Sequence, residues 1–172
     1  MQDREENNMN WKEQSLQMTD LLGLEMPPVA VLFLDQAPEE VPRAKTAAPA
    51  GCGYWKSASD GKAFYTAASD HYHCPIGAWT HHVDLSQAQE KELDGMVALM
   101  VKLGYVSKEE TAHIPRMEAS FRFATYVPLG ESSGKPDVVL VRGNARQLML
   151  LVEAAQAAGS LGETAPSGRP TC

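Results

Sequence analysis

The sequence predicts an α/β or α+β protein in which helices flank a mixed β-sheet within a single domain. Stretches with apolar residues at helical spacing alternate along the chain with short runs rich in β-branched residues. At 172 residues the chain is long enough to bury one sizeable core. Its hydrophobic content of 44% is ordinary for a globular protein, which argues against general disorder.

The predicted domain covers residues 11–172 and follows a polar, acidic lead-in over residues 1–10 that we expect to be disordered. The chain has no run of about 18 apolar residues, so no membrane span is predicted. The polar N-terminus is the opposite of a secretory signal and favours a cytoplasmic protein. A net charge of -7 argues against a protein that holds nucleic-acid phosphates by bulk charge.

Four segments are predicted to be β-strands. Continuous apolar runs indicate two buried strands, alternating residues indicate another, and an Asp-Gly pair marks the start of the fourth. Residues 36–51 contain three prolines and no periodicity, so they are predicted to form a loop. The predicted strands cover residues 28–35, 60–67, 119–129 and 137–144.

Helices are indicated by apolar residues at i, i+3 and i+4 and by residues suited to helix ends. Gly23, Gly104 and Gly159 are placed to end helices. Ser86 opens a capping-box pattern, and Asn144 is the expected N-cap of the last helix. The predicted helices cover residues 11–24, 52–59, a segment beginning at Pro75, 86–103, 107–114 and 145–159.

Cys74 is the strongest candidate for a chemical role. Pro75 favours the first helical position, which places Cys74 at or next to the N-cap of a helix. The N–H groups and dipole at a helix N-terminus favour a thiolate, and protonated histidines nearby would lower the pKa of the thiol further. Cys74 is therefore predicted to be a metal ligand or a nucleophile, against the simpler interpretation of a half-buried, unreactive cysteine.

Cys52 lies between Gly51 and Gly53, and glycines on both sides allow a backbone to approach a ligand closely. The pattern fits a cysteine presented to a cofactor, and it also fits a tight turn around a small apolar residue. Cys52 and Cys74 are far apart and neither belongs to a C-x-x-C pair, which excludes zinc-ribbon and thioredoxin signatures. Three cysteines are also too few for a disulfide framework.

The stretch HYHCPIGAWTHH, residues 71–82, holds four of the five histidines. Imidazole is a common metal ligand and proton carrier. On an extended segment His71 and His73 would point the same way. On a helix His81 and His82 point about 100° apart, so at most one of them faces the site. The simpler interpretation is that most of these side chains are solvated.

Tyr54, Trp55 and Trp79 are candidates for an aromatic wall beside the cysteines, although packing in the core is the simpler interpretation. The strand-to-helix turn at Gly143 and Asn144 could bind an anion through its N–H groups. Its simpler role is that of a helix cap. Neither this turn nor residues 130–136 match a dinucleotide or Walker fingerprint.

The order of landmarks along the chain resembles one known family. The landmarks are a helix followed by PPVAVLFLD, then GCGYW, HCPIGAW, PDVVLVRGNARQLMLLVEA and SGRPTC. From about Trp11 to Cys172 they look like the domain of unknown function 169 family, also labelled ArCR. The resemblance implies a cytoplasmic protein of bacteria or archaea without an assigned reaction. It also implies a domain that continues past Cys172, so that this chain lacks its C-terminal part.

The resemblance further implies landmark cysteines at Cys52, Cys74 and Cys172. Our leading hypothesis is that these three thiolates hold an iron–sulfur cluster or a related metal centre, because soft thiolates are the usual ligands of such clusters. Three protein ligands would leave one iron for a substrate, another cysteine or a histidine such as His73. A redox partner or a small molecule would then interact with this centre.

Two other functions stay open from the sequence. A metal-free thiol enzyme would use Cys74 as the nucleophile and a neighbouring histidine as the base. A non-catalytic module would bind a small apolar or anionic ligand through Trp55, Trp79 and the turn at Gly143 and Asn144. The sequence indicates neither a substrate nor an oligomeric state.

Overall fold

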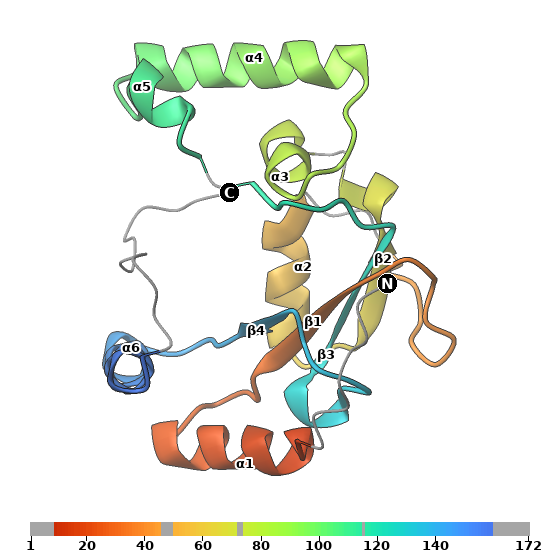
Figure 1. Ribbon diagram of the computed structural model, residues 1–172, viewed down its shortest axis with the longest axis vertical. Helices are drawn as coiled ribbons and strands as arrows, with labels where there is room; N and C mark the ends of the chain where they lie inside the picture. The colour runs from red at the N-terminus through yellow and green to blue at the C-terminus, as the bar shows by residue number, and fades with distance from the viewer. Residues whose placement is uncertain (1–8, 46–49, 72–73, 115, 160–172) are drawn as a thin grey trace. The chain divides into compact units, whose positions relative to one another are not determined.

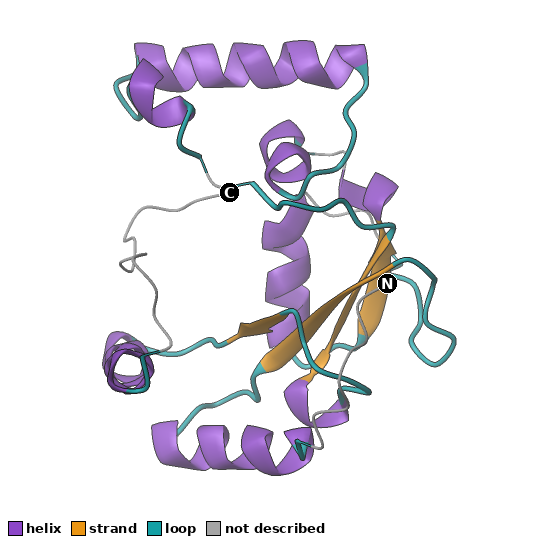
Figure 2. Ribbon diagram, viewed as in Figure 1, coloured by secondary structure: helices purple, strands orange, loops and turns teal. Residues whose placement is uncertain are grey.

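The computed structural model describes residues 9–45, 50–71, 74–114 and 116–159. In these ranges, helices and a four-stranded sheet confirm the predicted α/β class; Figure 1 labels the elements along the chain and Figure 2 distinguishes helices from strands. The described residues form two compact units. The first unit takes its residues from 1–32, 55–64 and 125–171, and the second from 33–54 and 65–124.

The strands are β1 (Val29–Leu34), β2 (Phe64–Ala67), β3 (Phe123–Pro128) and β4 (Val138–Leu140). Their order in the sheet is β2-β3-β1-β4. β1 and β4 run antiparallel, with Val29 opposite Leu140. The next residue on the β1 side is Pro28, which has no N–H to donate, so the ladder ends there. This explains why β4 is shorter than the predicted strand over residues 137–144.

β2 and β4 are the outer strands of the sheet. The free side of β2 is partly covered, because Tyr65 donates to the Pro42 carbonyl at 2.9 Å and accepts from the Ala44 N–H at 2.8 Å. These bonds form a parallel bridge centred on Arg43. β4 is only 3 residues long, and its two valines are 41% and 40% exposed. Each outer edge is thus either covered in part or short.

The predicted strand over residues 60–67 begins only at Phe64. Asp60 and Gly61 continue the turn at the end of the preceding helix, with Gly61 at φ 81. This left-handed conformation suits glycine and ends the helical path before the strand begins. β3 likewise covers only the inner part of the predicted strand over residues 119–129.

Helix α2 (Ala50–Ser59) is longer than the one or two turns predicted for residues 52–59. It begins inside the segment 36–51, which was predicted to be a loop. Tyr54 and Ala58 lie one turn apart and are 2% and 1% exposed, so burial of this face stabilises the helix. The glycines near its start are weak helix formers, which is why the sequence alone underestimates its length.

Helix α1 (Trp11–Leu22) has the predicted signals at both ends. The Asn10 side chain accepts a hydrogen bond from the Glu13 N–H at 3.2 Å, which caps the N-terminus. Gly23 follows the last turn with φ 62, as predicted, and its N–H returns to the Asp20 carbonyl.

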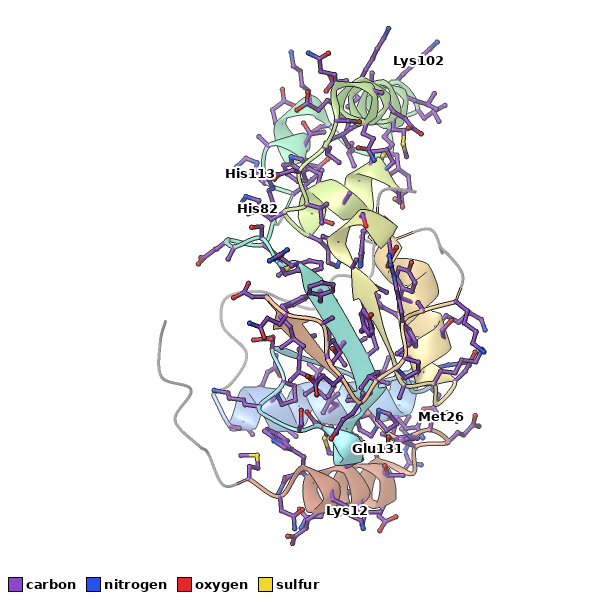
Figure 3. The ribbon with its side chains drawn as sticks, turned by 90° about the vertical axis from the view of Figure 1, so that its right-hand side faces the viewer. Lys12, Met26, His82, Lys102, His113 and Glu131 are labelled. Atoms are coloured by element: carbon purple, nitrogen blue, oxygen red, sulfur yellow. The ribbon has the colours of Figure 1, made fainter. Side chains whose placement is uncertain are left out.

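Helix α1 packs against the 3₁₀ turn η2 (Leu129–Glu131), and Figure 3 shows Lys12 and Glu131 at this contact. The two backbones approach closely: a Cβ added at Gly130 would lie 3.4 Å from the Cα of Lys12. Leu129 beside it is 1% exposed. Glycine at this position therefore allows α1 to settle on η2, and the contact closes one part of the first unit's core.

Helix α6 (Ala145–Ala157) begins with a complete capping box, which confirms Asn144 as its N-cap. The Asn144 side chain accepts from the Gln147 N–H at 3.0 Å, and the Gln147 side chain accepts from the Asn144 N–H at 2.8 Å. The Gln147 amide also donates to the Gly23 carbonyl at 2.6 Å, which ties α6 to the end of α1. The polar groups of Asn144 are thus used within the helix cap.

Replacing Asn144 by alanine is expected to lower the free energy of unfolding by about 1 kcal/mol, the usual loss for an N-cap. The matched control Asn144→Asp keeps an acceptor oxygen and should change stability by less than about 0.5 kcal/mol. Urea unfolding of the three proteins measures both differences. An alanine variant as stable as the aspartate variant would contradict a stabilising role for this cap.

In the second unit, the helices are η1 (Ala68–His71), α3 (Pro75–Thr80), α4 (Gln87–Lys102) and α5 (Lys108–Thr111). The predicted capping box at Ser86 and the predicted cap at Ser107 are both present. Gly104 follows α4 with φ 70, in the predicted position for its end. Helix α3 packs against both η1 and α4, and Figure 1 shows α3 below α4.

Candidate cysteine and histidine site

Cys74 is the N-cap of α3, as the sequence predicts. Its backbone is extended, and its Sγ accepts a hydrogen bond from the Gly77 N–H at 3.4 Å. Pro75 occupies the start of the helix, where its missing N–H costs nothing. Cys74 is half-buried, and the hydrogen bond from Gly77 positions its sulfur at the end of the helix.

The described residues do not show the other predicted ligands next to Cys74. The Cys52 backbone lies in the first turns of α2, instead of the tight turn that its glycines suggested, and the position of its side chain is outside the described part. His73 and Cys172 also lie outside it, as does the Gly51 environment. Among the described residues no group of three or more His, Cys, Asp or Glu side chains could hold a metal ion.

The three aromatic candidates have different environments. Tyr54 is buried, and its ring lies 5.3 Å from that of His71, centroid to centroid. Trp79 is half-buried in α3 and Arg116 lies over its ring. Trp55 is 36% exposed on α2, next to the half-buried Gly53. Of the proposed aromatic wall, the structure thus places Tyr54 in the histidine cluster and Trp79 on α3 itself.

His71 is fully buried, at 0% exposure, in the turn just before Cys74. Its Nε2 lies 3.0 Å from the Thr66 hydroxyl, which also donates to the Ala124 carbonyl at 3.4 Å. A hydroxyl has one proton to donate, so while it donates to Ala124 it accepts from a protonated Nε2. The Nδ1 atom is then the unprotonated nitrogen, and it is buried without a hydrogen-bond partner among the described residues.

Rings surround His71 on several sides. The centroids of His81 and Phe121 lie 5.5 Å and 5.6 Å from that of His71, in addition to Tyr54. The pKa of His71 is lowered to about 4, mainly by burial among these groups and also by the charge of His81, while Asp70 partly opposes the shift. His71 is therefore a neutral imidazole at pH 7, and its carbonyl accepts from the Cys74 N–H at 3.4 Å.

Asp70 fixes the turn that carries His71. Its carboxylate accepts from the Arg43 guanidinium at 2.8 Å and from the Ala67 N–H at 2.8 Å. Burial by itself would raise the pKa of Asp70, but these hydrogen bonds and the Arg43 charge outweigh it and hold the pKa below its usual value. The Tyr54 hydroxyl donates to the Asp70 carbonyl at 3.2 Å. The turn is thus anchored from three directions.

His81 and His82 have their ring orientations set by backbone carbonyls. The Nδ1 of His81 lies 2.7 Å from the Gly77 carbonyl, and the Nδ1 of His82 lies 2.8 Å from the Met117 carbonyl. A carbonyl only accepts, so in both rings Nδ1 carries the proton and Nε2 is the basic nitrogen. His81 contacts the ring of His71. Because α3 ends at Thr80, with His81 as its C-cap, the predicted separation of His81 and His82 around a helix does not apply here.

The burial of His71 and the supporting roles of Thr66, Asp70 and Arg43 were not anticipated from the sequence. The available signal was the short segment AASDH, in which aspartate can accept from an N–H three residues earlier and form a turn. An extended segment was expected for residues 71–73. Of these, His71 belongs to the turn instead.

None of the helices in the described ranges is both long and apolar enough to cross a membrane. A search of curated proteins and a search of solved structures found no match to the chain. The model of one protein family, described as uncharacterised ArCR, matches residues 17–172. This match covers nearly the whole sequence and agrees with the resemblance carried by its landmarks. The chain therefore belongs to the domain of unknown function 169 family.

Proposed function

We propose that this protein is a cytoplasmic cofactor-binding protein in which Cys52, Cys74 and Cys172 hold an iron–sulfur cluster or a related metal centre. The observation that supports it best is the Cys74 sulfur, which is half-buried at the start of α3 and accepts the Gly77 N–H at 3.4 Å. Hydrogen bonds to the ligating sulfurs are among the features that tune such clusters.

The surroundings of Cys74 fit a thiolate ligand. The Cys74 N–H donates to the His71 carbonyl at 3.4 Å, so the cap and the histidine turn are joined through the backbone. His71 is neutral and lies among rings in the turn that precedes Cys74, and weakly polar surroundings of this kind would favour a cluster screened from water. A bound cluster would supply one-electron transfer, or an open iron for a small molecule or a redox partner.

The proposal is tested by anaerobic purification and reconstitution, followed by iron and sulfide analysis. Wild-type protein is expected to take up both elements, and Cys74→Ser is expected to lose most of them, because a hydroxyl is a poor ligand for iron in a cluster. Thr80→Ser is the matched control: an equally conservative change at the other end of α3 that should leave uptake unchanged. A wild-type protein that stays colourless after reconstitution would refute the proposal.

A metal-free thiol enzyme makes different predictions for the same variants. Its wild type would bind no iron, and alkylation of Cys74 would depend on a neighbouring histidine that acts as the base. His81, whose Nδ1 is held by the Gly77 carbonyl at 2.7 Å, is the histidine at the C-terminal end of the same helix and the candidate base. His81→Gln would then slow this alkylation, whereas under the cluster proposal it would leave the iron content unchanged.

A further inference from the structure

An apolar cavity lies in the second unit, between α3, α4 and the segment after α5. Its volume is about 210 Å³. Figure 2, in the view of Figure 1, shows α5 at one end of α4 and α3 below α4. The apolar side chains that line the cavity come from all three elements and include Ile76, Trp79, Leu93, Val97, Met100 and Ile114.

Hydrogen bonds hold one wall of this cavity in place. The segment after α5 is joined to the end of α3 by the Met117 N–H, which donates to the Thr80 carbonyl at 2.9 Å, and by Arg116 Nε, which donates to the Trp79 carbonyl at 3.0 Å. His82 donates to the Met117 carbonyl from a left-handed backbone with φ 56, a conformation rare outside glycine. These bonds fix the wall before any ligand arrives, so the cavity is preformed.

Water is a poor occupant of this space. Among the described lining residues only Thr111 and Trp79 carry polar side-chain atoms, and the Thr111 hydroxyl already donates to the Lys108 carbonyl at 2.7 Å. An ordered water needs two or more polar partners, and this lining offers few. An engineered apolar cavity of about 150 Å³ in another protein binds benzene, so this cavity has room for one substituted aromatic ring.

A cation lies against one residue of the cavity wall. The Arg116 guanidinium carbon is 5.3 Å from the centre of the Trp79 ring, which lines the space. Arg116 Nε donates to the Trp79 carbonyl. The terminal nitrogens of Arg116 have no hydrogen-bond partner among the described residues. A planar guanidinium matches a carboxylate. We therefore propose that this cavity binds a small single-ring aromatic carboxylate, with the ring among the apolar side chains and the carboxylate on Arg116.

The isoleucines of the chain make a direct test. Ile76 and Ile114 both line the cavity, and the sequence contains no other isoleucine. Protein labelled with ¹³C only at the isoleucine δ1 methyl groups should give two NMR signals, both reporting on this site. Benzoate is the probe, and benzyl alcohol is its uncharged counterpart. Saturable shifts of both signals with benzoate are the expected result.

Three variants separate the parts of the proposal. Val97→Phe should fill the cavity and abolish the shifts with both probes, whereas Leu99→Phe, at a position on the same helix that is 55% exposed, should leave them unchanged. Arg116→Gln should lower the affinity for benzoate about fivefold, the effect of losing one exposed ion pair. It should leave the affinity for benzyl alcohol unchanged.

The absence of saturable shifts in wild-type protein would overturn the binding site, and this result needs no variant. Equal benzoate affinity in wild type and Arg116→Gln would overturn the role of the carboxylate. Equal shifts in wild type and a folded Val97→Phe would place binding elsewhere and also overturn it. The test does not depend on the cysteines, so its outcome is separate from that of iron uptake.

Discussion

Lowering the pH from 6.5 to about 4 is expected to reduce the free energy of unfolding by about 3 kcal/mol through His71 alone. The unfolded chain binds a proton at this histidine near its ordinary pKa of 6.5, whereas the folded protein resists it until about pH 4. Across this window the unfolded state binds more protons, so stability falls as the pH falls. Above pH 6.5 both states are neutral and the effect vanishes.

Urea unfolding at several pH values between 7 and 4 measures this slope. His71→Phe keeps a ring of similar size among Tyr54, His81 and Phe121 but cannot take up a proton, so its slope in this window should be much smaller. His113→Gln removes an exposed histidine and controls for the loss of any histidine. Asp70 contributes at lower pH, because its pKa is held below 3.8. The same slope in wild type and His71→Phe would contradict the assignment.

Leu129→Ala is expected to lower the free energy of unfolding by about 3 kcal/mol, within the range of about 2–5 kcal/mol for buried leucines. Leu129 is 1% exposed, and its N–H donates to the Pro28 carbonyl at 2.7 Å, so the turn that carries it is fixed. Because Gly130 already brings the backbone of η2 close to α1, the surroundings have little freedom to collapse into the space left behind.

The matched control is Leu21→Ala, the same chemical change on α1 at a position that is 83% exposed. It should alter stability by no more than about 0.5 kcal/mol. Denaturant midpoints and slopes of the three proteins give both values. If the two variants were equally stable, Leu129 would not be a core residue of the first unit.

Local sequence signals predicted most helix ends. Cys74 followed by Pro75, Ser86 with its capping box, and Asn144 each cap a helix where the sequence places them. These motifs depend on hydrogen bonds to residues only a few positions away, so a single sequence contains the needed information. The same locality explains why the placement of Cys74, the central residue of the candidate site, was predicted correctly.

The environment of His71 could not be predicted in this way. Its burial depends on Tyr54, Phe121 and Ala124, which lie far from it in the sequence and meet it only in the folded chain. Similarly, α2 owes its extra length to burial of one face, which its glycine-rich beginning does not reveal. The proposed three-cysteine site stays a prediction, because its other two sulfurs lie outside the described residues.

The outer strands of the sheet have a consequence for self-association. A long, flat outer strand is a template onto which a second chain can add its own strand, and such addition begins many aggregation reactions. Here Tyr65 on β2 already exchanges bonds with Pro42 and Ala44, and β4 offers only 3 residues. Strand addition at either edge would therefore gain few backbone hydrogen bonds, even though the valines of β4 are exposed.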